Sequence, residues 1–178
     1  MVRLPIETKD GEFVAYYSEL GLAGLEFPKE KGESDRFSSD KSTPSAEVRR
    51  WHALTTKALK QVLAGHTPET LPPLDLSSGT EFQQRVWKVL CGIGSGKTMS
   101  YMEVAAAIGQ SKATRAVGSA CGANPIPVLI PCHRVLAANQ GLGGFSGGLD
   151  WKRKLLAREG VEYIGSSTRQ RTLGLAIV

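Results

Sequence analysis

Cysteine and histidine are scarce in this sequence, with three of each in 178 residues. Three thiols cannot all pair in disulfides, and none forms a C-x-x-C or another close zinc-ligand spacing with the histidines. The scarcity argues against a disulfide-stapled fold and against a metal site. It favours free thiols in a reducing compartment.

Long hydrophobic runs are also missing. No apolar stretch approaches the ~18 residues of a membrane-spanning helix, and the start, Met-Val-Arg-Leu-Pro, lacks the apolar core of a signal peptide. Hydrophobic residues make up 41% and charged residues 22%, which excludes a wholly disordered or fibrous chain. We therefore expect a cytoplasmic protein without membrane contact, associated with the nucleoid if its source is bacterial.

Acidic residues are few in the second half of the chain. From Thr80 onward there are 12 Lys and Arg against 5 Asp and Glu, a net charge of +7, whereas residues 1–79 carry 10 against 12, a net charge of −2. A basic half is suited to contact a polyanion such as nucleic acid. A solvated basic face explains the same charge equally well.

The first 79 residues predict a small α/β domain with no obvious chemistry. Short apolar stretches within residues 2–27, broken by Lys9-Asp10-Gly11, indicate a hairpin followed by a further strand. Apolar residues at helical spacing predict a helix over residues 46–63.

Two polar segments flank that helix. Residues 28–44 are charged and Ser-rich, which favours a mobile loop. Residues 66–79 are polar and contain prolines, and we interpret them as the linker to a second domain.

The second domain, residues 80–178, is predicted to be mainly helical. The capping pattern Thr80-x-x-Gln83 opens an amphipathic helix. Ser100 caps a short helix over residues 101–108, and a helix of small residues follows over about 113–123. Helix, tight turn and helix is typical of a DNA-binding helix-turn-helix, although two ordinary packed helices fit the same letters.

Small residues in the second of these helices favour the DNA-binding interpretation. Ala116, Gly118 and Ser119 leave a low profile for close approach to DNA, and Arg115 projects from it.

One segment resembles a phosphate-binding P-loop but fails its requirements. Gly96-Lys97-Thr98 matches the end of the motif, whereas the glycine needed five residues before Gly96 is Cys91. The segment also follows a predicted helix rather than a strand. We interpret residues 92–98 as a flexible basic turn.

The chemistry centres on one cysteine. An apolar run over residues 126–130, suited to a buried strand or extended segment, leads into Pro131-Cys132-His133-Arg134. A cysteine is often just a small core residue, but cationic neighbours lower the pKa of a thiol and raise its thiolate fraction. In an extended chain His133 faces away from Cys132, so a proton passes between them only if the backbone turns after Pro131 or if a water molecule bridges them.

A histidine that relays protons normally has a carboxylate on its other ring nitrogen. We favour Glu159, at the end of an amphipathic helix over residues 151–159, although spacing alone does not decide. The acidic residues available in this half are Glu81, Glu103, Asp150, Glu159 and Glu162.

A glycine-dense loop, residues 139–148, lies between the cysteine and that helix. Such loops can be plain connectors, but glycine also lets backbone amides approach a ligand closely. With Phe145 for stacking and Ser146 for polar contact, this loop is suited to wall a pocket for a planar base.

Together these residues resemble the O6-alkylguanine-DNA alkyltransferases, also called methylated-DNA–protein-cysteine methyltransferases. The likeness rests on Pro131-Cys-His-Arg-Val135, Asn124-Pro-Ile-Pro-Val-Leu-Ile130 and Arg115-Ala-Val-Gly118, within about residues 80–160. It implies an α/β (α+β) fold: a small N-terminal domain with an antiparallel sheet and a helix, and a mainly helical C-terminal domain with a helix-turn-helix and the active-site cysteine.

The resemblance implies a catalytic set. Cys132 is the acceptor, His133 relays its proton through a water molecule, and Glu159 completes the relay. Asn124 braces the turn before the cysteine. Tyr101 presses on the phosphate of the flipped nucleotide and donates to a ring nitrogen of the departing guanine.

The resemblance also implies how DNA is held. The recognition helix enters the minor groove, which is only ~6 Å wide and suits the small residues noted above. Arg115 enters the base stack in place of the extruded nucleotide. The DNA-binding residues are Arg115, Tyr101, Ala116, Gly118 and Ser119, and the pocket residues are Val135, Phe145, Ser146, Gly147 and Cys121.

Two positions depart from the family pattern. Phe145 stands where relatives carry tyrosine, and Cys121 stands where some relatives carry a larger apolar residue. Both differences bear on which alkyl groups the pocket accepts. Residues 1–79 contain no cysteine, so the structural zinc of some relatives is not expected.

The implied function is direct-reversal DNA repair. A monomer, acting cooperatively on DNA or singly, transfers the alkyl group of O6-alkylguanine or O4-alkylthymine in double-stranded DNA to Cys132, once and irreversibly, with no cofactor or metal. Two alternatives are a non-transferring sensor of alkylated bases that recruits other factors, and a cysteine hydrolase that uses Cys132, His133 and Glu159.

Overall fold

The computed structural model describes residues 1–29 and 43–164, and the chain divides into two compact units. One unit comprises residues 1–80 and 125–129, and the other comprises residues 81–124 and 130–178. Residues 125–129 were predicted to belong to the second domain, but they pack with the first unit. There the backbone N–H of Leu25 donates to the carbonyl of Pro125 at 2.9 Å. The helix-turn-helix and the cysteine motif both belong to the second unit.

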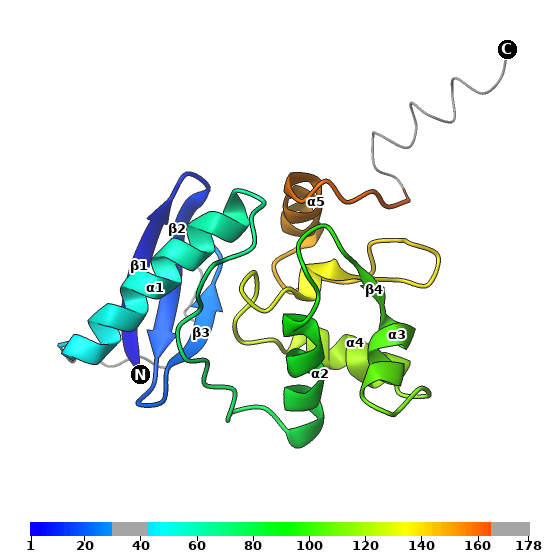
Figure 1. Cartoon of the computed structure of the whole chain (residues 1–178), viewed down its shortest axis with the longest axis horizontal. Coiled ribbons are helices and arrows are strands. Elements are labelled where there is room, and N and C mark those ends of the chain that lie inside the picture. The colour runs from blue at the N-terminus through cyan, green and yellow to red at the C-terminus, as the bar shows by residue number, and fades with distance from the viewer. Residues whose placement is uncertain (30–42, 165–178) are drawn as a thin grey trace, which may run out of the picture. The chain divides into compact units, whose positions relative to one another are not determined.

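The first unit is a three-stranded antiparallel sheet covered by one helix. Strands β1 (Val2–Thr8), β2 (Gly11–Tyr17) and β3 (Leu22–Glu26) pair in the order β1-β2-β3. Helix α1 (Ala46–Leu63) lies across one face of this sheet (Figure 1). The predicted hairpin, further strand and helix are confirmed.

Helix α1 begins where the sequence provides a cap. The Ser45 hydroxyl accepts a hydrogen bond from the backbone N–H of Val48 at 3.2 Å. The helix buries one apolar face against the sheet, and burial of that face stabilises the unit. The buried side chains of α1 are Val48, Trp51, Thr55, Ala58, Leu59, Val62 and Leu63.

The segment predicted to be a linker packs along the sheet instead. The backbone N–H of Leu22 donates to the carbonyl of Pro73, and the N–H of Asp75 donates to the carbonyl of Leu22, both at 2.8 Å. The Asp75 carboxylate also accepts a bond from the Ser18 hydroxyl at 2.6 Å. Residues 73–75 thus extend the pairing of β3. The loop predicted to be mobile, residues 28–44, lies mostly outside the described residues, as does the tail beyond residue 164.

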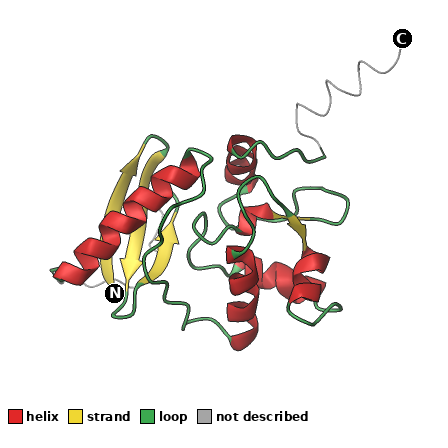
Figure 2. Ribbon diagram, viewed as in Figure 1, coloured by secondary structure: helices red, strands yellow, loops and turns green. Residues whose placement is uncertain are grey.

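The second unit is mainly helical, as predicted (Figure 2). Helices α2, α3 and α4 pack against one another, and α5 contacts the 3-10 turn η1. The Trp87 indole N–H donates to the carbonyl of Ala120 at 2.8 Å, which ties α2 to α4. The elements of this unit are α2 (Glu81–Cys91), β4 (Met99–Ser100), α3 (Tyr101–Ala107), α4 (Thr114–Gly122), η1 (Cys132–Arg134), β5 (Val135–Leu136) and α5 (Leu149–Arg158).

The apolar run before the cysteine is buried but is not the predicted strand. Residues 126–130 form turns and isolated bridges, and Val128 has a φ of 75°. A β-branched residue rarely adopts this left-handed conformation, so the surrounding packing must impose it. The sequence pattern of this run resembles that of a strand because burial, whatever the backbone conformation, selects apolar side chains.

A short parallel strand pairing, which the sequence pattern did not predict, joins the segment before α3 to the segment that follows the cysteine motif. Met99 pairs with Val135 and Ser100 with Leu136. Ser100 also caps α3 in the predicted way, because its hydroxyl accepts from the N–H of Glu103 while the Glu103 carboxylate accepts from the N–H of Ser100. The start of α3, with Tyr101, is therefore held beside the strand that follows the cysteine motif.

No helix in the described part of the chain is both long enough and apolar enough to cross a membrane.

Replacing Ser100 by alanine should lower the free energy of unfolding by about 1 kcal/mol, because one N-terminal backbone N–H of α3 loses its acceptor. Urea unfolding followed by circular dichroism measures the loss. Ser111→Ala, at an exposed turn residue, serves as the control and should change little. Equal stability of the two variants would contradict a stabilising role for the cap.

Candidate active site

Cys132 begins a tight 3-10 turn and is almost completely buried, with 3% of its surface exposed. The side-chain amide of Asn124 donates to its sulfur at 3.1 Å and to the carbonyl of Ile130 at 2.9 Å. Asn124 is itself fully buried. It therefore links the end of α4 to the turn that presents the thiol, in the bracing position expected for it.

The adjacent cations do not lower the pKa of this thiol, contrary to the prediction from sequence. Burial raises the pKa of Cys132 to about 11, and the hydrogen bond from Asn124 and the charge of Lys152 offset only part of that rise. The Arg134 guanidinium pairs with Glu159 and the carbonyl of Ile93, and His133 contacts Glu159 through Nε2. At neutral pH the sulfur is therefore a thiol, and it could act as a nucleophile only with the help of a base.

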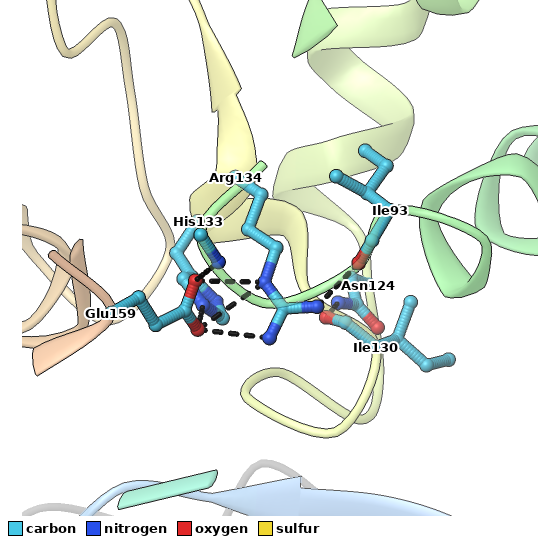
Figure 3. A network of polar contacts seen from close by, with 7 residues as sticks. Ile93, Asn124, Ile130, His133, Arg134 and Glu159 are labelled. Atoms are coloured by element: carbon cyan, nitrogen blue, oxygen red, sulfur yellow. Dashed lines mark hydrogen bonds and ion pairs between the residues drawn. The ribbon is translucent and has the colours of Figure 1, made fainter. Parts of the chain in front are cut away.

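His133 and Glu159 form a buried pair (Figure 3). The imidazole Nε2 lies 2.9 Å from Oε1 of Glu159, with the histidine side chain 0% and the carboxylate 1% exposed. The carboxylate chosen among five acidic residues is thus the one that contacts His133.

Arg134 clamps the same carboxylate. Its Nε lies 3.0 Å from Oε2 and its terminal NH2 lies 2.9 Å from Oε1 of Glu159, a bidentate geometry. Another guanidinium N–H donates to the carbonyl of Ile93. The Arg134 guanidinium is therefore paired with the Glu159 carboxylate and not with the Cys132 sulfur.

The segment over residues 92–98, whose sequence resembles a P-loop, also contacts Glu159 and Arg134. Ile93 supplies the carbonyl just described, and the N–H of Gly96 donates to Oε2 of Glu159 at 3.4 Å. Gly96 has a φ of 74°, which glycine adopts freely. The segment over residues 92–98 is thus held against the Glu159 carboxylate and is not simply a flexible basic turn.

The charge states of the pair follow from their surroundings. Burial alone would raise the pKa of Glu159, but hydrogen bonds from His133 and Arg134 outweigh it and lower the pKa to about 2. Burial lowers the pKa of His133 and outweighs the opposing pull of Glu159. A neutral imidazole beside an ionised carboxylate donates its N–H to it, so Nε2 carries the hydrogen and Nδ1 carries the lone pair.

The Nδ1 atom of His133 is buried and has no hydrogen-bond partner in the described part of the chain. Buried polar atoms are rarely left in this state, and exceptions often mark a reactive group. Phe145 lies edge-on to the imidazole, with ring centroids 6.4 Å apart. The residue that follows the cysteine in sequence thus has an acceptor nitrogen available for a proton.

A cavity of about 680 Å³ opens at the sulfur. It brings together eight of the residues that sequence reasoning proposed for DNA or substrate contact or for catalysis, and adds Thr114, Gly122 and Gly144. The predicted residues that line it are Tyr101, Arg115, Gly118, Ser119, Cys121, Cys132, Phe145 and Ser146.

Three predicted contact residues do not line the cavity. Ala116 is exposed on α4 beside Arg115. Val135 is fully buried in β5, and Gly147 lies in the loop just beyond Ser146. Asn124, His133 and Glu159 sit behind the cysteine rather than on the cavity wall.

Tyr101 packs against the glycine-rich loop across the cavity. Gly143 has a φ of 64°, and a Cβ on it would lie 2.9 Å from the Tyr101 hydroxyl, so only glycine permits this approach. A backbone hydrogen bond with Gly144 holds the hydroxyl. Burial raises the pKa of Tyr101, so the phenol keeps its proton at neutral pH and can donate a hydrogen bond.

Sequence reasoning missed Lys152, which is fully buried on α5. Its ammonium donates to the carbonyl of Val135 at 2.6 Å and to that of Gly144 at 3.3 Å. The signal was present in the sequence: Lys152 falls on the same helical face as Leu155 and Leu156. A charge on an apolar stripe marks a buried group with a specific role.

Lowering the pH should destabilise the protein between about 4.5 and 2, because the pKa of Glu159 falls from its ordinary 4.5 to about 2 on folding. A depressed carboxyl pKa contributes stability that is complete above 4.5 and lost towards 2. Glu159→Gln should lose this part of the pH dependence and, at pH 7, about 3–5 kcal/mol, since Arg134 stays buried without its counter-ion.

Urea unfolding at a series of pH values tests this, with Glu162→Gln, at an exposed position of the same segment, as the control. A wild-type pH dependence in Glu159→Gln would show that this carboxylate is not held ionised by the network.

Comparisons with known proteins agree with this geometry. The family described as 6-O-methylguanine DNA methyltransferase, DNA binding domain, matches residues 81–161. The methylated-DNA–protein-cysteine methyltransferase of Mycobacterium tuberculosis is 50% identical over 101 residues, covering 57% of this chain and 61% of that protein. The protein of the same name from Methanosarcina barkeri is 37% identical over 159 residues, covering 86% of this chain and 94% of that protein.

A solved structure shares the fold. The crystal structure of Mycobacterium tuberculosis OGT in complex with DNA has a TM-score of 0.73 and 36% identity, covering 89% of this chain and 92% of that chain. The chain spans only 26% to 61% of the length of several curated relatives. The match to the Methanosarcina protein nevertheless runs over nearly its whole length, and the predicted fold is confirmed, so the chain belongs to the O6-methylguanine-DNA methyltransferase family.

Proposed function

We propose that this chain repairs DNA by transferring the alkyl group of O6-alkylguanine, and of O4-alkylthymine, irreversibly to Cys132. The observation that carries the proposal is the alignment of a cavity-lining thiol, an acceptor nitrogen and an ionised carboxylate. Cys132 lines a cavity large enough for a purine, and His133, the next residue in the chain, pairs with Glu159 through Nε2. Family membership supplies the reaction type.

The proton transfer follows from the charge states. The lone pair on Nδ1 of His133 accepts the thiol proton of Cys132 through a bridging water molecule, because no direct bond joins the two side chains among the described contacts. The imidazolium that forms is stabilised by Glu159 at 2.9 Å. Base and carboxylate are both buried, so each charge interacts strongly with the next.

The covalent step is an in-line displacement. The thiolate of Cys132 forms a bond to the alkyl carbon as the bond from that carbon to O6 breaks. The electron pair of the broken bond stays on the guanine, which gains one proton at a ring nitrogen, balancing the proton that the thiol lost. Tyr101, on the cavity wall, can pass this proton to the guanine; its phenol then regains a proton from solvent, and the His133 imidazolium returns the thiol proton to solvent.

The product explains why each chain reacts once. A thioether is a poor leaving group, and the described site holds no second base aimed at the alkylated sulfur. A cysteine hydrolase would instead release its product and turn over repeatedly. A sensor that recruits other factors would leave Cys132 unmodified.

The base reaches the cavity by leaving the DNA stack, at a cost of a few kcal/mol. Helix α4 offers a face of exposed small residues, Ala116 and Ser119, with Arg115 beside them. This low profile suits the minor groove, and Arg115 fills the gap left by the extruded nucleotide. We therefore infer that double-stranded DNA is the partner, and we expect the chain to bind it as a monomer, singly or cooperatively.

Three cavity residues bear on alkyl size. Cys121 has a small side chain, Gly122 has none, and Phe145 supplies a ring without a hydroxyl. We expect groups larger than methyl, such as benzyl, to be accepted.

Incubating the protein with an excess of duplex that contains O6-methylguanine should repair one base per chain and then stop. Intact-protein mass spectrometry should show one methyl group in place of one hydrogen, located at Cys132. Cys132→Ser should repair nothing while still binding the duplex, and Cys91→Ser, at an exposed thiol, should behave as wild type. Repair of more bases than chains, or methylation elsewhere, would overturn the proposal.

Replacing Arg115 by alanine should slow repair of duplex DNA about tenfold or more, which corresponds to about 1.4 kcal/mol. Reaction with free O6-benzylguanine should stay within about twofold of wild type, since a free base leaves no gap to fill. Single-turnover rates on the two substrates measure the difference. Arg153→Ala, an exposed arginine on α5, controls for charge, and an equal loss on both substrates would remove the proposed role of Arg115.

A further inference from the structure

A Schellman motif closes helix α5 directly after the carboxylate of the proton relay. Gly160 has a φ of 68°, and its backbone N–H donates to the carbonyl of Ala157 at 3.2 Å. The N–H of Val161 donates to the carbonyl of Leu156 at 3.0 Å. In this motif the glycine in the left-handed conformation turns the chain off the helix axis. We call the residues that follow, 161–164, the tail segment.

The tail segment packs against the glycine-rich loop through apolar side chains. Tyr163 is buried, with 7% of its surface exposed, in a cluster with Leu136 of β5 and Leu156 of α5. Leu142 from the loop and Val161 pack against this cluster. The tyrosine ring is its largest side chain and therefore contributes most of the apolar surface that the cluster buries.

A backbone hydrogen bond joins the same two segments. The N–H of Ile164 donates to the carbonyl of Gln140 at 3.1 Å. Gln140 has a φ of 60°, in a tight turn closed by a bond from its own N–H to the carbonyl of Ala137 at 2.8 Å. A residue with a side chain adopts this left-handed conformation at a cost, so other contacts must hold it there. The tail segment supplies two of them, the apolar packing and the backbone bond.

The loop that the tail segment contacts forms part of the cavity wall. Phe145 and Ser146 line the cavity, and the Phe145 ring lies edge-on to His133 with ring centroids 6.4 Å apart. Five of the ten residues from 139 to 148 are glycine, which gives this loop unusual conformational freedom. Leu142 stands only three residues before Phe145, so a shift at the base of the loop moves the wall.

We propose that the tail segment supports the alkyl-transfer site, and that Tyr163 is a positioning residue which, through Leu142, holds the glycine-rich loop and Phe145 in place to receive the base. This inference rests on the proposed function and adds to it a support for the pocket from the chain beyond Glu159. Tyr163 is not among the residues that line the cavity, so it acts through the loop. A loop that is in place for only part of the time lowers the apparent affinity for the base by that fraction.

Four substitutions separate this role from a general contribution to stability. Tyr163→Ala removes the ring, Tyr163→Phe keeps it, and Leu142→Ala removes the loop's side of the contact. Val62→Ala is the control, because Val62 is buried on α1 in the first unit. All assays are run at a temperature at which thermal unfolding shows each variant to be folded. Since Leu142 is only partly buried, Leu142→Ala keeps the test available if Tyr163→Ala does not fold.

Amide hydrogen exchange, followed by NMR, measures how firmly the loop is held. The N–H groups of Ala137 and Gln140 are hydrogen-bonded within the turn at its base. Their exchange should be about tenfold faster in Tyr163→Ala and Leu142→Ala, because the turn opens more often. Tyr163→Phe and Val62→Ala should keep the wild-type exchange rates.

The functional readout compares a substrate that needs only the pocket with a ligand that needs only the DNA-binding face. The second-order rate constant of Cys132 with free O6-benzylguanine should fall about fivefold in Tyr163→Ala and Leu142→Ala, as expected if the wall is in place for about a fifth of the time. The double variant should lose no more than either single variant, because both break the same contact. The dissociation constant for an unmodified duplex should stay unchanged in all variants.

Wild-type rates with O6-benzylguanine in both Tyr163→Ala and Leu142→Ala would overturn the inference. An equal fall in Val62→Ala, or in Tyr163→Phe, would overturn it too, since the first would indicate lost stability and the second a role for the hydroxyl. Failure of the proposed function looks different. In that case the wild-type protein would react neither with O6-benzylguanine nor with the methylated duplex, while amide exchange would still separate Tyr163→Ala from Val62→Ala.

Discussion

The ionised carboxylate of Glu159, buried between an imidazole and a guanidinium, is the interaction on which the site depends. It fixes the tautomer of His133 by accepting from Nε2, and it thereby leaves Nδ1 as the acceptor next to the cysteine. A carboxylate in this position is tolerable only because Arg134 binds it in bidentate fashion. Without Arg134 the carboxylate would tend to take up a proton, and the histidine would lose the partner that orients it.

The charges around the sulfur alternate in sign once the proton has moved. The thiolate is negative, the imidazolium positive, Glu159 negative and Arg134 positive. Each charge is stabilised by its neighbours in a site of low dielectric constant. Before the reaction the thiol is neutral at pH 7, because burial raises its pKa to about 11. In the proposed mechanism the site therefore holds an unreactive thiol, and transfer of its proton to His133 generates the nucleophile.

Much of the fold followed from the sequence, because local signals governed it. Helical periodicity and a serine cap located α1, and the Ser100 capping box located the start of α3. Long-range contacts were beyond such signals. The apolar run over residues 126–130 could not be distinguished from a strand, since burial in an irregular turn selects the same side chains. Likewise, adjacency in sequence suggested that Arg134 acts on Cys132, whereas the 3-10 turn directs it to a residue 25 positions away. Lys152 was missed because it stands in a run of three basic residues, Lys152-Arg153-Lys154, of which the other two are exposed.

The protonation state of His133 is the most direct test of the proposed proton transfer from Cys132. Nitrogen-15 NMR of the labelled imidazole distinguishes the neutral Nε2–H tautomer, the neutral Nδ1–H tautomer and the cation. We predict a neutral ring with hydrogen on Nε2 at pH 6.5, which is the ordinary pKa of histidine. The ring is neutral at this pH because burial lowers the pKa of His133. Hydrogen on Nδ1 in the unreacted protein, in either the neutral ring or the cation, would leave the Cys132 proton without an acceptor and contradict the account.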